Sequence, residues 1–163
     1  MTTHSIRYRA KKTEVGTFIQ STVSGIQKYN WPKKLKILIA EDDPTSEMLI
    51  SLIVNTFGRE ILKVQTGMAA IEACRQNPDI DLILMDIQMP HMGGYEATRQ
   101  IRGFNKDVVI IAQTAYGLSG DREKAIEAGC NDYIAKPINK LDLMALIQKH
   151  LINDQAYSAK QIK

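Results

Sequence analysis

LILMDIQMPHMGG, at residues 82–94, joins a short apolar run to a turn through one acidic residue, Asp86. The run Leu82–Met85 has the length and the continuous apolar character of a strand buried on both faces, as in a parallel sheet. Gly93 and Gly94 indicate the turn that follows. Open α/β sheets bind their ligands outside the carboxyl ends of the strands. We therefore expect Asp86 to lie at a functional site.

The sequence on both sides of this stretch alternates between short apolar runs and amphipathic segments. Strands are expected at residues 36–40, 61–64, 82–86, 108–112 and 132–135, and helices at about residues 45–57, 69–74, 94–101, 121–127 and 140–151. Right-handed crossovers between such strands place helices on both faces of a parallel sheet. The predicted fold class is therefore a doubly wound α/β domain with a five-stranded parallel sheet.

Local signals support individual helices. Asp43 can cap the first helix, and Pro44 fits its first position because a missing N–H costs little there. Gly129 is placed to supply a left-handed C-cap for the helix at residues 121–127. Two apolar faces recur at helical spacing: Met48, Leu49, Leu52 and Ile53 in the first helix, and Leu143, Met144 and Ile147, which are expected to face inward, in the last.

The positive charge is concentrated at the N-terminus of the 163-residue chain. Residues 1–36 contain eight Lys or Arg residues and one acid, Glu14, whereas the remainder is mildly acidic. Aromatic and Arg residues are not interleaved there as on a nucleic-acid-binding face, so a solvated linker is the preferred interpretation. We expect a basic extension or linker at residues 1–34, one folded domain at residues 35–152 and a short tail at residues 153–163, with no DNA-binding domain.

Other features exclude several classes of protein. No apolar stretch approaches the roughly 20 residues that a membrane helix needs, and no signal peptide is visible. Cys74 and Cys130 are too few for a disulfide framework and lack metal-ligand spacing, so a reduced, cytoplasmic protein without a membrane segment is expected. His4, His91 and His150 have no ligand partners at metal spacing and are expected to be exposed.

A set of polar residues follows the predicted strands. Because parallel strands point the same way, Glu41, Asp42, Asp86, Thr114 and Lys136 should meet at one edge of the sheet. Neighbouring carboxylates repel one another by roughly 4 kcal/mol per close pair at an effective dielectric constant of about 20. A divalent cation relieves this repulsion, and a set of oxygen ligands favours Mg²⁺.

Such a site suits phosphoryl transfer, which depends mainly on positioning and charge neutralisation. Asp86 can attack phosphorus as a carboxylate nucleophile and form an acyl phosphate. The Lys136 ammonium and the metal would neutralise the phosphoryl oxygens, and the Thr114 hydroxyl would donate a hydrogen bond to one of them. These three residues are the candidate catalytic residues.

This constellation closely resembles the receiver domain of two-component response regulators. The resemblance covers about residues 35–152 and lies in Ile37–Pro44 (ILIAEDDP), Leu82–Gly94 (LILMDIQMPHMGG), Gln113–Ala115 (QTA) and Tyr133–Pro137 (YIAKP). It implies a flavodoxin-like fold, with Asp86 as the phosphoacceptor. It also implies that Glu41, Asp42, Asp86 and the Gln88 backbone carbonyl hold Mg²⁺, and that Tyr133 is an aromatic switch whose rotamer follows Thr114.

The resemblance has one departure and leaves one property open. The family usually has an acidic or polar residue where Gly93 precedes Gly94, and two glycines weaken the helix start. This departure puts partner preference or loop rigidity in doubt, but not phosphorylation. Family positions equivalent to Gln88 and Tyr116 tune how long the phosphoryl group survives, so the lifetime cannot be read from the sequence.

The resemblance implies a phospho-accepting domain in a phosphorelay. The domain would take a phosphoryl group from a phosphohistidine of a histidine kinase or a histidine phosphotransfer domain, and then change its partner binding. It would not be an enzyme beyond catalysing its own phosphorylation and dephosphorylation. The alternative is a receiver-like interaction module that works without phosphorylation. A phosphatase or flavin-binding protein is disfavoured, because Glu41–Asp43 would repel a phosphate and no general acid is evident.

The N-terminal segment leaves two contexts open. Asn30–Lys34 (NWPKK) resembles the linker that enters the C-terminal receivers of hybrid histidine kinases. Glu14–Phe18 (EVGTF) weakly resembles the closing strand of a kinase ATP-binding domain. The chain is therefore either a fragment of a hybrid kinase or a stand-alone regulator, and a homodimer is a candidate assembly.

Overall fold

The structure is a computed structural model that describes residues 33–115 and 120–153. Glu14–Phe18, Asn30–Pro32, Tyr116 and His4 lie outside these residues. The elements in chain order are β1 (Leu35–Ala40), α2 (Pro44–Val54), β2 (Gly58–Val64), α3 (Gly67–Gln76), β3 (Leu82–Asp86), α4 (Gly94–Arg102), β4 (Val109–Thr114), α5 (Asp121–Ala128), β5 (Asp132–Ala135) and α6 (Lys140–Gln148), followed by a π-helical turn, Lys149–Asn153.

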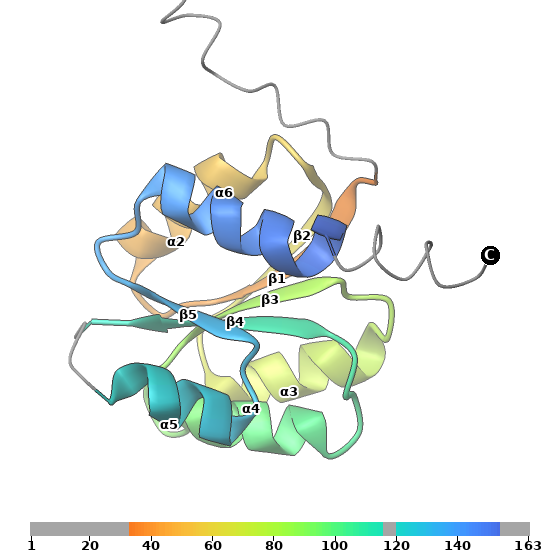
Figure 1. The fold of residues 1–163 in the computed structure, drawn as a ribbon. Helices are drawn as coiled ribbons and strands as arrows, with labels where there is room; N and C mark the ends of the chain where they lie inside the picture. Colours follow the sequence, from red (N-terminus) through yellow and green to blue (C-terminus); the bar gives the residue numbers. More distant parts are fainter. Residues whose placement is uncertain (1–32, 116–119, 154–163) are drawn as a thin grey trace, which may run out of the picture. The chain divides into compact units, whose positions relative to one another are not determined.

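The five strands form one parallel sheet in the order β2-β1-β3-β4-β5. This is the doubly wound, flavodoxin-like order, so the predicted fold class is confirmed. Helices α2 and α6 cover one face of the sheet and α3, α4 and α5 cover the other (Figure 1). The central strands β1, β3 and β4 are buried along their whole length, because both of their faces lie under helices.

Most predicted elements are confirmed, with shifts at their ends. Strand β2 begins at Gly58, three residues earlier than expected, because Gly58 pairs with Leu35 of β1. Strand β4 continues through Gln113 to Thr114, because these residues pair with Ile134 and Ala135 of β5. The α-helical part of the last helix ends at residue 148, and its remainder is the π-helical turn.

The predicted caps are confirmed. Asp43 precedes α2 and its Oδ2 accepts a hydrogen bond from the Ser46 amide at 2.7 Å, with Pro44 as the first helical residue. This contact holds the pKa of Asp43 below its usual value. Gly129 ends α5 with φ 102°, a left-handed conformation that favours glycine.

The apolar face of α2 differs from the expectation. Ile53 is buried, but Met48, Leu49 and Leu52 are 61%, 44% and 65% exposed. The helix instead packs on the sheet through Ile50, Ile53 and Val54, so it is apolar on two sides. In α6, Leu143, Met144 and Ile147 face inward as predicted.

The cysteine and histidine expectations have mixed outcomes. Cys74 and Cys130 are buried free thiols in the core. The prediction that His150 is exposed is wrong, because its ring is half-buried and its Nε2 lies 2.9 Å from Oδ2 of the buried Asp132. In residues 33–115 and 120–153, no helix is long and apolar enough to cross a membrane.

Candidate functional site

Three carboxylates meet at the carboxyl ends of β1 and β3. Glu41 and Asp42 follow β1 directly, and Asp86 is the last residue of β3. One carboxylate oxygen from each of the three residues lies within 4.8 Å of the others. Glu41 and Asp86 are buried, whereas Asp42 is exposed at the mouth of the cluster. The parallel register, which pairs Ala40 with Met85, brings the two strand ends side by side.

Lys136 supplies the counter-charge of this cluster. It follows β5, and its Nζ lies 2.8 Å from Asp86 Oδ2 and 2.7 Å from Glu41 Oε2. Its backbone amide donates to the Thr114 carbonyl oxygen at 2.7 Å, and the Lys136–Pro137 peptide bond is cis. The ammonium therefore lies between the two buried acids, as the sequence predicts for this edge of the sheet.

Burial and charge shift the pKa values of this cluster. Burial raises the pKa of Glu41 to about 7; the Asp86 carboxylate adds to the rise and Lys136 opposes it. Burial alone would lower the pKa of Lys136, but its hydrogen bonds to Asp86 and Glu41 outweigh burial and raise it. Glu41 therefore titrates near neutral pH while Lys136 stays positively charged.

The donor set fits a hard divalent cation. Within the described residues, the buried Glu41 Oε2 makes no hydrogen bond of acceptable geometry, although the Lys136 ammonium is close to it. The Lys136 ammonium offsets only one of the three clustered negative charges, so the cluster retains an excess of carboxylate for a divalent cation. Three carboxylates with one exposed member match the way Mg²⁺ binds, through a few carboxylates while it keeps several waters.

The loop after Asp86 is held close to its carboxylate. The backbone N–H of Gln88 donates a hydrogen bond to Asp86 Oδ1 at 3.0 Å. Gly94 begins α4 directly beside this loop, where an added Cβ would overlap the Asp86 carbonyl oxygen. Gly93 is the N-cap of α4 and has no side chain to cap it, in line with the expected weak helix start.

Thr114 and Tyr133 lie on the same face of the sheet. Thr114 is the last residue of β4 and is buried. It pairs with Ala135, and Tyr133 pairs with Ala112, so the alternation along the strands puts Thr114 and Tyr133 on the same face. This is the face of the α3–α5 helices, because Ala112 and Tyr133 pack in the same core cluster as residues of these helices. Tyr133 is partly buried and packs against the core on this face. The neighbouring strands thus place the predicted switch residue near the predicted phosphoryl contact.

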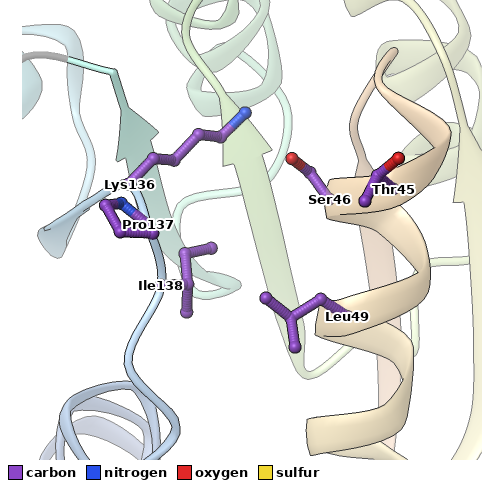
Figure 2. Close-up of a pocket in the computed structure, with 6 residues that line it drawn as sticks. All are labelled: Thr45, Ser46, Leu49, Lys136, Pro137 and Ile138. Atoms are coloured by element: carbon purple, nitrogen blue, oxygen red, sulfur yellow. The ribbon is translucent and has the colours of Figure 1, made fainter.

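Sequence reasoning missed two features of this region. The first is Asp121, whose carboxylate accepts a hydrogen bond from the Thr114 hydroxyl at 3.1 Å. The second is a small pocket of about 100 Å³ next to the cluster, lined by Thr45, Ser46, Leu49, Lys136, Pro137 and Ile138. Figure 2 shows the side chains of Leu49 and Ile138 pointing toward each other across it.

The sequence carries a signal for an exposed apolar side of α2, to which the pocket residue Leu49 belongs. Residues 48–54 of α2 are almost entirely apolar, more than one buried helix face requires. The excess lies in Met48, Leu49 and Leu52, which form the outer side of α2. We call Met48, Leu49 and Leu52 the α2 apolar surface.

The comparisons with known proteins agree with this geometry. The family model for the response regulator receiver domain matches residues 37–148. The sensor protein GacS of Pseudomonas syringae pv. syringae is 32% identical over 119 residues, which are 70% of this chain and 13% of GacS. The chain therefore spans only a small part of the length of that curated relative.

Two solved structures show the same fold. The receiver domain of the sensor histidine kinase PA1611 from Pseudomonas aeruginosa PAO1, solved with a magnesium ion in its active-site cleft, is 37% identical. Its TM-score is 0.64, and the match covers 71% of this chain and 96% of that one. The co-crystal structure of the Saccharomyces cerevisiae histidine phosphotransfer protein Ypd1 with the receiver domain of Ssk1 matches at 30% identity and a TM-score of 0.67, over 74% of this chain and 94% of that one.

Fold, site and family match together define a receiver domain of two-component signalling. The chain belongs to the response regulator receiver domain family, whose members here include receiver regions of histidine kinases.

Proposed function

We propose that this chain accepts a phosphoryl group on Asp86 from a partner phosphohistidine, with Mg²⁺ as its cofactor. The observation that carries the proposal is the Lys136 ammonium between the buried carboxylates of Asp86 and Glu41. A structural ion pair would need one acid, whereas three acids and one Lys at a strand edge are suited to binding both a cation and an anion. A passive interaction module would not need this arrangement.

Each residue has a defined task in the transfer. An Asp86 carboxylate oxygen attacks phosphorus, the P–N bond to the donor imidazole breaks, and the new P–O bond makes Asp86 an acyl phosphate. Lys136 leaves its carboxylate partners to neutralise a phosphoryl oxygen, and the Thr114 hydroxyl donates to another. The departing imidazole keeps the P–N electron pair and takes a proton from water.

Glu41, Asp42, Asp86 and the Gln88 carbonyl are the proposed metal ligands. When bound there, Mg²⁺ supplies positive charge that offsets the phosphoryl oxygens. The buried Glu41 oxygen and the exposed Asp42 support this set, because one holds a fixed position and the other lies open to solvent. Tyr133 is the proposed switch, since its strand continues directly to Lys136.

The α2 apolar surface is the proposed docking site of the phosphodonor. Leu49 belongs both to this surface and to the pocket that Lys136 lines, so a partner seated there reaches the site edge. Three large apolar side chains exposed within five residues of one helix favour a protein contact. The partner is a histidine kinase or a histidine phosphotransfer domain, the kind of protein bound in the related Ypd1–Ssk1 co-crystal.

The proposal assigns residues 35–152 to the receiver domain, residues 1–34 to a linker and residues 153–163 to a tail. It makes the chain a signalling domain whose only catalysis is its own phosphorylation and dephosphorylation. Its place is the cytoplasm, where the thiols of Cys74 and Cys130 stay reduced. Either a hybrid kinase or a stand-alone regulator can carry such a domain, and the proposal holds for both.

The test is incubation with a small phosphodonor and Mg²⁺, followed by intact-mass measurement. The wild-type chain should gain one phosphoryl group, and chelation of Mg²⁺ should prevent the gain. Asp86→Asn should gain none, whereas the control Asp142→Asn, at an exposed acid of α6, should match the wild type. Equal gain by Asp86→Asn would reject the proposal, and no gain by the wild type would favour the passive interaction module.

A further inference from the structure

A hydrogen bond joins the end of β4 to the start of α5. The Thr114 hydroxyl donates to Asp121 Oδ2 at 3.1 Å. Thr114 is the last residue of β4 and is buried, and Asp121 is the first residue of α5. The contact therefore connects a proposed phosphoryl-binding residue directly to a helix on the outer layer of the domain.

Asp121 lines a cavity next to the proposed phosphorylation site. The cavity is about 280 Å³ in volume, and Gln88, Thr114 and Asp121 line it together with Tyr95 and Lys124. The Tyr95 hydroxyl donates to the Asp121 carbonyl oxygen at 3.5 Å. Burial raises the pKa of Tyr95, and the Asp121 charge adds to the rise. The cavity thus connects the loop after Asp86 with the first turn of α5.

Among the described residues, no side chain caps the start of α5. Its N-cap is Gly120, with φ 107°, which offers no side chain to cap the first turn. Helices usually gain this restraint from a Ser, Thr, Asp or Asn at the N-cap. The contacts that Asp121 makes with Thr114 and Tyr95 therefore act as restraints on this helix end.

We propose that Asp121 is a latch that holds Thr114 in the unphosphorylated arrangement and competes with the phosphoryl group for its hydroxyl proton. The inference rests on the proposed function, in which Thr114 donates to that group. A Thr hydroxyl has one proton to donate, so the two acceptors exclude each other. After phosphorylation of Asp86, the Thr114 hydroxyl keeps its proton but donates its hydrogen bond to a phosphoryl oxygen, and α5 then loses its bond to β4.

The latch makes Asp121 a positioning residue that sets the balance between two states. Its carboxylate stabilises the state without a phosphoryl group, and so lowers the apparent affinity for any ligand that needs Thr114 as a donor.

The test is a calorimetric titration with beryllofluoride and Mg²⁺, which mimic the phosphoryl group. Asp121→Ala should tighten the affinity about five- to tenfold, the lower range of typical coupling between sites. Glu123→Ala removes an exposed acid from the same first turn and should leave the affinity at the wild-type value. In a Thr114→Val background, Asp121→Ala should have no effect, because no hydroxyl is left to hold.

The ligand-free protein gives a second readout. Asp121→Ala should speed amide hydrogen exchange in the first turn of α5, and Asp121→Asn, which keeps an acceptor oxygen, should do so less. Unchanged affinity and exchange in Asp121→Ala would overturn the latch. An equal gain in affinity in Glu123→Ala or in the Thr114→Val background would also overturn it, since charge alone would then explain the effect. If the wild type binds no beryllofluoride with Mg²⁺, the proposed function itself fails.

Discussion

Glu41→Gln should stabilise the metal-free protein, because Gln stands in for the protonated form of this buried acid. The pKa of Glu41 is raised from 4.5 to about 7, chiefly by burial. An acid with a raised folded pKa contributes stability below its unfolded pKa, and this stability is lost as the pH rises to the folded value. One pKa unit corresponds to about 1.4 kcal/mol, so the wild type loses about 3 kcal/mol between pH 4.5 and pH 7.

The assay is urea denaturation with a chelator present. The stability gain of Glu41→Gln over the wild type should increase by about 2 kcal/mol from about pH 5.5 to about pH 8. The control is Glu47→Gln, at an acid whose pKa is lowered by its hydrogen bond to Lys63, so this substitution should not stabilise at either pH. A Glu41→Gln protein no more stable than the wild type at pH 8, or a gain independent of pH, would refute the reasoning.

Three further predictions concern residues around the site. Gln113→Leu should raise the free energy of unfolding in urea by about 1–2 kcal/mol, because the buried amide atoms of Gln113 have no hydrogen-bond partner among the described residues. Gly94→Ala should lower it by about 2 kcal/mol, since the new Cβ would overlap the Asp86 carbonyl oxygen. Asp132→Asn should flatten the loss of stability below about pH 4. Burial alone would raise the pKa of Asp132, but its hydrogen bonds with Lys149 and His150 outweigh burial and lower it. The wild type therefore loses the stability that the ionised acid contributes as the pH falls through this lowered pKa. Loss of stability in Gln113→Leu, wild-type stability in Gly94→Ala, or an unchanged acid limb in Asp132→Asn would contradict the respective prediction.

The sheet and its site edge could be predicted because the signals are local. Continuous aliphatic runs such as Leu82–Met85 identify buried parallel strands. The end of each run then shows which polar residues follow the strand. Parallel direction alone brings Asp86, Glu41 and Lys136 to one edge. The sequence therefore contains this part of the answer in its order of residues, and the contacts between these side chains agree with it.

The remainder depends on contacts that no period encodes. The helical spacing of Met48, Leu49 and Leu52 indicates a helix, but it does not say which of two apolar sides packs on the sheet. The Thr114–Asp121 bond depends on how the start of α5 is placed against β4. Thr114 ends a strand and Asp121 begins a helix, so no single period relates the two positions. His150, which contacts Asp132, lies in a π-helical turn beyond α6, and the residue pattern does not predict such a turn.

The central claim is that Asp86 receives the phosphoryl group. Its most direct test is peptide mapping by mass spectrometry after phosphotransfer from a phosphorylated histidine phosphotransfer protein in Mg²⁺, with borohydride reduction to mark the acyl phosphate. The account predicts that the mark lies on Asp86 and is absent without Mg²⁺. A mark on another residue, with Asp86 unmodified, would contradict it.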